Sequence, residues 1–150
     1  LLNAARSALA LNDSASAKLY YTQVTAEIKG EAQAESNYYL AHFEYVQSKY
    51  EASNERIFWM IDNLPTYPQW RWKSLLLMAK NYAGLQDDFQ ANYTLDYIID
   101  NAEGAIVGEA QQFKSDLTRR RAAEEAKAQI SDTLEVAPTE MEELEELDQE

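Results

Sequence analysis

The sequence has 150 residues, 46% of them apolar, which is enough for one domain with a buried core. It contains no cysteine, which excludes disulfides and thiolate metal sites, and its single histidine, His42, cannot form the histidine pairs of common metal sites. A net charge of −13 argues against nucleic acid as a partner, because phosphate binding needs clustered lysine and arginine. We therefore expect neither a metal nor another cofactor.

The acidic charge lies mainly at the C-terminal end. Residues 131–150 hold nine acidic residues and no basic ones, so residues 1–130 carry 17 acidic and 13 basic residues, a net charge of −4. The chain contains no apolar run of about 18 residues, so we predict no membrane span in it. Because it begins at Leu1 without a methionine, we expect a processed chain or a piece of a longer one.

The apolar residues recur at steps of three and four along most of the chain. They predict six helices, over residues 1–10, 14–28, 32–48, 51–63, 70–84 and 88–101. The residues between them agree with these boundaries. Asp13 and Ser14 are typical N-cap residues, and Gly30 is typical of a helix C-terminal cap. Pro65 and Pro68 exclude a continuous helix between the fourth and fifth segments.

Small residues recur with a common register. Ala5, Ala41 and Ala79 are 36 and 38 residues apart, and twelve residues after each stands another small residue, namely Ala17, Ser53 and Ala91. Large apolar residues follow in the same register, at Tyr21, Val24, Ile57, Met60, Leu95 and Ile98. Two helices approach closely only where the facing side chain is small, so this register predicts three helical pairs, over residues 1–29, 31–65 and 70–101.

The segment after the third pair carries one apolar stripe, at Ile106, Ala110, Phe113 and Leu117. Because the last pair of an array has no neighbour on its outer side, residues 105–128 are predicted to form a capping helix. The acidic residues 129–150 are predicted to be a disordered tail. Met141, Leu144 and Leu147 could align on one side of a short helix, so the tail is either solvated chain or a ligand for a basic surface of its own protein.

The segment from Trp70 to Asn101 resembles a tetratricopeptide repeat (TPR). The TPR pattern is filled in spacing by Leu75, Met78, Ala79, Tyr82, Ala91 and Leu95. The chain departs from that pattern where Leu75 replaces the tryptophan, Glu44 replaces the tyrosine and Ser53 replaces an alanine. The resemblance covers residues 1–101, and it implies an all-α, right-handed α-solenoid of about three antiparallel helical pairs with a C-terminal capping helix.

A TPR fold implies a non-catalytic scaffold that binds a protein or peptide. In that family the first helix of each pair lines a concave face, which places seven residues there: Arg6, Tyr38, His42, Tyr45, Lys73, Leu76 and Lys80. Cations among aromatic rings suit a peptide with acidic or carboxylate groups, whereas the alternative is an ordinary wetted surface. The family's carboxylate clamp is incomplete, since Leu2, Tyr39 and Leu77 stand where polar side chains are expected.

A second resemblance concerns a divergent bacterial subset of TPR proteins, found as C-terminal portions of cell-envelope proteins. It rests on Trp70, Lys73, Leu76, Leu77, Ala79 and Tyr82, followed by Phe89-Gln90-Ala91. It implies the periplasm or cell envelope, with the cytoplasm as the alternative. It also keeps open a second role, as a structural assembly element or an accessory domain of a larger envelope protein.

The sequence carries no signal of catalysis. His42 with Glu35 or Glu44 is the one conceivable acid–base group, and no nucleophile or glycine-rich phosphate loop accompanies it. We therefore expect no enzyme activity. Most of the ten tyrosines and three tryptophans are predicted to be core residues, with Tyr21, Tyr82 and Phe89 in packing positions.

Overall fold

The computed structural model describes the backbone of residues 1–147 and the side chains of residues 1–131. This part of the chain is all-α and contains no strand. Its seven helices are α1 (Leu2–Ala10), α2 (Ser14–Glu27), α3 (Glu31–Val46), α4 (Tyr50–Asn63), α5 (Pro68–Gly84), α6 (Asp88–Asn101) and α7 (Ala105–Leu147). The six helices predicted up to residue 101 are confirmed, with ends that differ by at most two residues.

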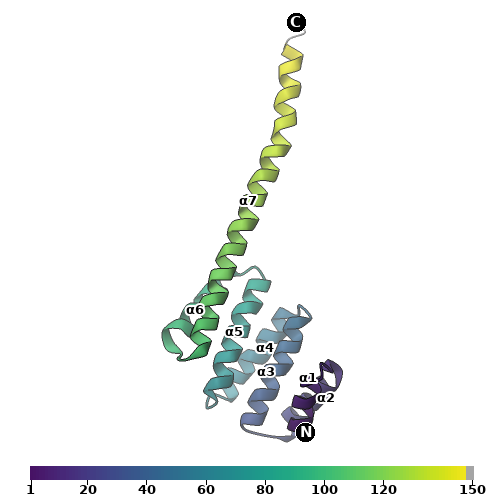
Figure 1. Ribbon diagram of the computed structural model, residues 1–150, viewed down its shortest axis with the longest axis vertical. Helices are drawn as coiled ribbons and strands as arrows, with labels where there is room; N and C mark the ends of the chain where they lie inside the picture. Colours follow the sequence, from purple (N-terminus) through teal and green to yellow (C-terminus); the bar gives the residue numbers. More distant parts are fainter. Residues whose placement is uncertain (148–150) are drawn as a thin grey trace. The chain divides into compact units, whose positions relative to one another are not determined.

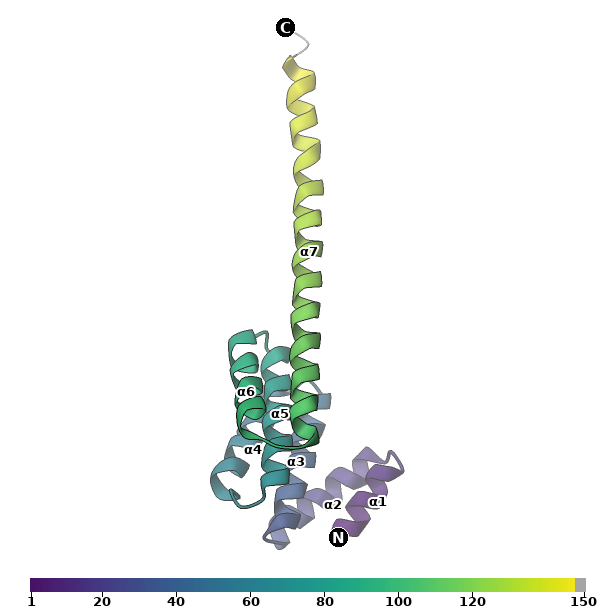
Figure 2. The same ribbon diagram turned by 60° about the vertical axis from the view of Figure 1, so that its left-hand side comes forward.

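The first six helices form consecutive pairs within one compact unit, residues 1–111. Each odd-numbered helix packs against the next, and the pairs are joined by packing of α2 on α3 and of α4 on α5. Helix α3 also packs beside α5 (Figures 1 and 2). The chain therefore has a repeat-like helical fold. A regular right-handed solenoid path stays a prediction.

The turn inside each pair is built in the same way. Its central residues, Asn12, Ser48 and Gln86, all adopt a left-handed conformation, with φ of 58°, 57° and 61°. In each turn the next amide donates to a carbonyl five residues earlier, from Asp13 to Ala8, from Lys49 to Glu44 and from Asp87 to Tyr82, each at 2.9 Å. This is the Schellman pattern that closes helix C-termini. The three pairs thus repeat in backbone geometry as well as in sequence spacing.

The start of each second helix follows directly from the turn. Asp13 and Asp87 are N-caps whose carboxylates accept hydrogen bonds of 3.1 Å from the amides of Ser16 and Gln90. Hydrogen bonding from the Ser16 side chain, and then from its amide, lowers the pKa of Asp13, because the charged carboxylate is the better acceptor. Lys49 occupies the same position before α4 and makes no side-chain cap. The prediction of Asp13 as an N-cap is confirmed.

Gly30 does not cap the end of the second helix, so that prediction is wrong. Helix α2 ends at Glu27, and Ile28 already has extended backbone. Gly30 instead precedes α3 as its N-cap, with φ of 86°. A residue with a Cβ rarely adopts this conformation, and a Cβ here would lie 3.3 Å from the Tyr67 hydroxyl. Pro68 is the first residue of α5, where its missing N–H costs nothing.

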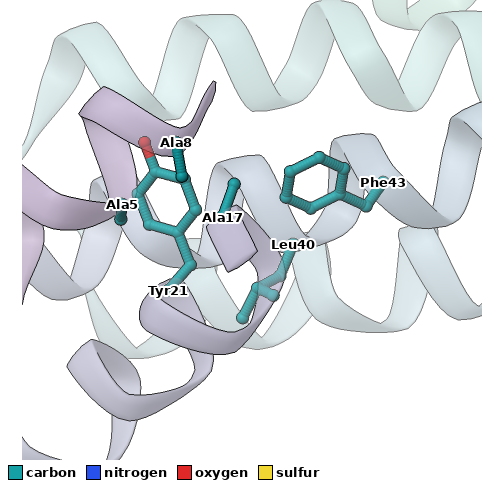
Figure 3. Close-up of a cluster of buried hydrophobic side chains, with 6 residues drawn as sticks. All are labelled: Ala5, Ala8, Ala17, Tyr21, Leu40 and Phe43. Atoms are coloured by element: carbon teal, nitrogen blue, oxygen red, sulfur yellow. The ribbon is translucent and has the colours of Figure 1, made fainter. Parts of the chain in front are cut away.

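The predicted register is visible in the burial of the core. All six small residues, Ala5, Ala17, Ala41, Ser53, Ala79 and Ala91, are fully buried, and the six large apolar positions are at most 2% exposed. In the first pair, Ala5 and Ala17 lie beside the ring of Tyr21, and Leu40 and Phe43 of α3 complete the cluster (Figure 3). Small residues let the helices approach, and large ones fill the space between them.

Phe89 is an exception, because 77% of its surface is exposed and its predicted packing role is wrong. It lies two residues before the buried Ala91, and a step of two residues turns a side chain by about 200° around a helix. Phe89 therefore points away from the face that Ala91 presents to α5. Tyr21 is fully buried and Tyr82 is half-buried, as expected for packing positions.

Residues 112–150 form a second unit, which is described by itself. Its described part, up to Leu147, is the remainder of α7, where Arg119 pairs with Asp116 and Arg121 with Glu124. The capping role of residues 105–128 and the disorder of residues 129–150 stay predictions. The stripe of Met141, Leu144 and Leu147 lies outside the described side chains. Among the described helices, none combines the length and apolar character that a membrane crossing requires.

Candidate functional site

Three of the predicted site residues form an aromatic row on α3. Tyr38, His42 and Tyr45 are spaced by four and three residues, which places them on one side of the helix. The ring centroids of Tyr38 and His42 are 6.4 Å apart, and those of His42 and Tyr45 are 6.1 Å apart. All three side chains are half-buried, so each offers part of its ring to solvent.

Trp70 of α5 connects this row to the next pair. Its ring centroid lies 5.7 Å from that of Tyr38 and 6.1 Å from that of Tyr39. One helical turn later, the ammonium nitrogen of Lys73 lies 4.7 Å from the Trp70 ring centroid, in a cation–π contact. Trp70 was not among the predicted site residues, although its position three residues before Lys73 was a usable signal.

Lys80 brings a second cation to the same row. Burial lowers the pKa of His42, and the nearby charge of Lys80 lowers it further, because both disfavour a protonated imidazole. Burial also raises the pKa of Tyr38, with smaller contributions from Tyr39 and from Glu109 in the first turns of α7. The face formed by α3 and α5 therefore carries two lysines next to a neutral imidazole and aromatic rings. We call Tyr38, His42, Tyr45, Lys73 and Lys80, together with Trp70, the α3–α5 face.

Arg6 is held by a partner that the sequence alone did not reveal. Its guanidinium donates from Nε to Oε1 of Glu35 at 2.7 Å and from Nη2 to Oε2 at 2.5 Å. The Glu35 side chain is only 5% exposed, whereas that of Arg6 is 54% exposed. The two-point contact raises the pKa of Arg6 and neutralises the buried carboxylate. The main role of Arg6 is therefore structural: its ion pair links α1 to α3.

A cavity of about 370 Å³ lies beside this ion pair. It is lined by Arg6, Leu9, Ala10, Tyr21, Glu35, Tyr39 and Trp70. The rings of Tyr21 and Tyr39 are stacked with centroids 4.9 Å apart. Within the described residues, the buried Tyr21 hydroxyl and Trp70 Nε1 have no hydrogen-bond partner. The cavity shares Trp70 with the α3–α5 face and so extends that face toward α1.

Leu76 does not belong to an accessible surface, because only 4% of it is exposed. The resemblance to TPR proteins placed it on the concave face, because it lies in the first helix of its pair. It did not take into account that α5 packs beside α3, which buries apolar side chains between the two helices. The structure thus brings Tyr38, His42, Tyr45, Lys73 and Lys80 together, places Arg6 at the margin in its ion pair, and removes Leu76.

No protein-family model and no curated protein matches the sequence. The candidate site is therefore inferred from its geometry alone. In the described residues, no group of three or more histidine, aspartate or glutamate side chains is placed to hold a metal ion. The chemistry available at the α3–α5 face is that of cations and aromatic rings.

Proposed function

We propose that this protein is a non-catalytic scaffold of the TPR type, whose α3–α5 face binds a peptide with acidic or carboxylate groups. The observation that carries the proposal is the contact of Trp70 with both Lys73 on its own helix and Tyr38 on α3. Through these two contacts, Trp70 joins side chains of α3 and α5 in one surface. A TPR-like array, with the first helix of each pair on the inner side, would present this surface to an extended chain.

The chemistry of the face favours an acidic ligand. Lys73 and Lys80 supply charge, and His42 stays neutral at pH 7 because its pKa is lowered, so it can accept or donate a hydrogen bond. Aromatic rings around the cations exclude water from one side of an ion pair, which strengthens it relative to an exposed pair. Aromatic rings also offer apolar contacts to the backbone and side chains of an extended peptide.

The test uses a displayed library of random ten-residue peptides and the full chain as bait. We expect the selected peptides to be enriched in aspartate and glutamate. Binding of one selected peptide should weaken at least tenfold in the double variant Lys73→Ala, Lys80→Ala, and it should weaken with added salt. The matched control is Lys18→Ala, Lys29→Ala, which removes the same charge from exposed positions outside the face. Equal loss in both double variants would refute a specific site.

The second role, assembly with copies of itself, is supported by the exposed aromatic side chains of α4 and α6, among them Phe58 and Tyr93. Light scattering on the full chain over a range of concentrations separates the two roles. A stable oligomer would support the assembly role, and an oligomer that no longer binds the selected peptide would contradict peptide binding at the α3–α5 face.

A further inference from the structure

A second surface, formed by α4 and α6, exposes large aromatic side chains. Phe58 is 49% exposed, Trp59 44%, Phe89 77%, Tyr93 66% and Tyr97 40%. Single exposed apolar residues are ordinary, but a contiguous group on neighbouring helices is typical of a binding surface. Three of these residues, Phe58, Tyr93 and Tyr97, line one groove.

The groove has a volume of about 290 Å³. Its walls are Phe58 of α4 and Tyr93 and Tyr97 of α6, and its floor is formed by Leu75, Met78 and Tyr82 of α5. The ring of Trp72 lies against that of Tyr97, with centroids 6.0 Å apart, and supports one wall from the side. The lining is therefore mainly apolar, and all of it belongs to the first unit.

This groove is separate from the α3–α5 face. The floor residue Leu75 is two positions after Lys73, and Tyr82 is two positions after Lys80. A step of two residues turns a side chain by about 200° around a helix, so the lysines and the floor lie on opposite sides of α5. A ligand on one surface does not occupy the other.

The edges of the groove are acidic. On α4, Glu55 and Asp62 are exposed on the same stripe as Phe58, and on α6, Asp100 follows Tyr93 and Tyr97 at helical spacing. Helices α4 and α6 together contain six acidic residues, one arginine and no lysine. That arginine, Arg56, is paired with Glu44 of α3 at 2.9 Å. The aromatic groove thus has a negative rim.

We infer that the groove between α4 and α6 binds a basic amphipathic helix of another protein. Apolar side chains of such a helix, spaced by three and four residues, fill the space between Phe58 and Tyr93. Its lysines and arginines pair with Glu55, Asp62 and Asp100, and they stack on the exposed aromatic rings. A second copy of this chain fits less well, because a twofold contact would place the acidic rim of one copy against that of the other.

The probe for this site is a fluorescein-labelled 14-residue helix of leucine and lysine, with the leucines at steps of three and four. We expect it to bind the full chain, and its fluorescence anisotropy to report at least tenfold weaker binding to the double variant Phe58→Ala, Tyr93→Ala. Both side chains are about half exposed or more, so these changes leave the core intact. The matched control is Leu11→Ala, Leu19→Ala, which removes two exposed apolar side chains of the first pair, outside both surfaces, and it should bind the probe as the unchanged protein does.

The role of the acidic rim is tested with the double variant Glu55→Gln, Asp100→Asn. This variant should bind the probe more weakly, and its binding should depend less on salt. In the unchanged protein, the probe should shift the indole N–H resonance of Trp72, next to the groove wall. The inference is overturned by equal binding to the groove variant and the Leu11, Leu19 control, or by an unchanged Trp72 resonance at saturation. It is also overturned by a dimer that the groove variant abolishes, since the occupant would then be a second copy. The double variant Lys73→Ala, Lys80→Ala should still bind this probe. A failure of the proposed peptide site on the α3–α5 face can therefore be distinguished from a failure of the groove between α4 and α6.

Discussion

The hydroxyl of Ser53 donates a hydrogen bond of 2.9 Å to the carbonyl oxygen of Ala41, twelve residues earlier. The same hydroxyl accepts a bond of 2.8 Å from the side-chain amide of Asn81, which also donates to Asn54 at 2.8 Å. All of these groups are buried. One small side chain therefore fixes the crossing of α3 with α4 and ties that pair to α5.

Replacing Ser53 with alanine should destabilise the protein by about 1–3 kcal/mol, because it leaves two buried polar groups with one partner fewer. Urea unfolding monitored by circular dichroism measures the change. The control is Ser7→Ala, an exposed serine in α1, where we expect a change within about 0.5 kcal/mol. Equal effects at the two sites would show that the buried hydroxyl contributes nothing specific.

Replacing Ala79 with leucine should overpack the contact between α5 and α6 and cost about 1–3 kcal/mol of stability, since Ala79 has no exposed surface. Thermal or urea unfolding is the measurement. Ala26→Leu, at an exposed position of α2, introduces the same side chain without a clash and should be nearly neutral. A stable Ala79 variant would mean that the inferred helix contact at this position is wrong.

The N-terminus of α4 has no side-chain cap, and adding one should stabilise the protein. Lys49 stands where Asp13 and Asp87 cap the other second helices, so Lys49→Ser should be more stable than Lys49→Ala by about 0.5–2 kcal/mol. Comparing serine with alanine at one position keeps the loss of the lysine charge the same. Urea unfolding of the two variants tests this, and indistinguishable midpoints would contradict it.

The lowered pKa of His42 makes stability depend on pH. The unfolded chain takes up a proton as pH falls through the ordinary histidine pKa of about 6.5, whereas the folded imidazole resists it beside Lys80, between the rings of Tyr38 and Tyr45. The protein should therefore lose stability between pH 7 and pH 5, and His42→Gln should lose less. Urea titrations at the two pH values measure both, and parallel losses would contradict the assignment.

The all-α fold and the pairing of its helices could be predicted from sequence, because their determinants are local and periodic. Ala5, Ala41 and Ala79 recur in one register, and the small residue twelve positions later lies in the adjacent helix of the same pair. Turn residues were harder. Asn12, Ser48 and Gln86 share a left-handed conformation without sharing a residue type, so their equivalence is visible only in the backbone.

The proximity of three candidate site residues on α3 could be predicted for a related reason. Tyr38, His42 and Tyr45 lie on one helix, where spacing decides which side chains are neighbours. The pairing of Arg6 with Glu35 joins residues 29 positions apart, and no helical periodicity predicts it. Leu76 and Phe89 were misplaced because burial depends on which neighbouring helix covers a position.

The three identical turns give this chain built-in reporters of local opening. The amides of Asp13, Lys49 and Asp87 each donate across the turn of one pair, so each can exchange with deuterium only when that pair opens. When residues 1–150 are studied by themselves, the first pair contacts a neighbouring pair on one side only. We therefore expect the Asp13 amide to exchange faster than that of Lys49 in the middle pair, and equal rates would mean that the three pairs open together as one cooperative unit.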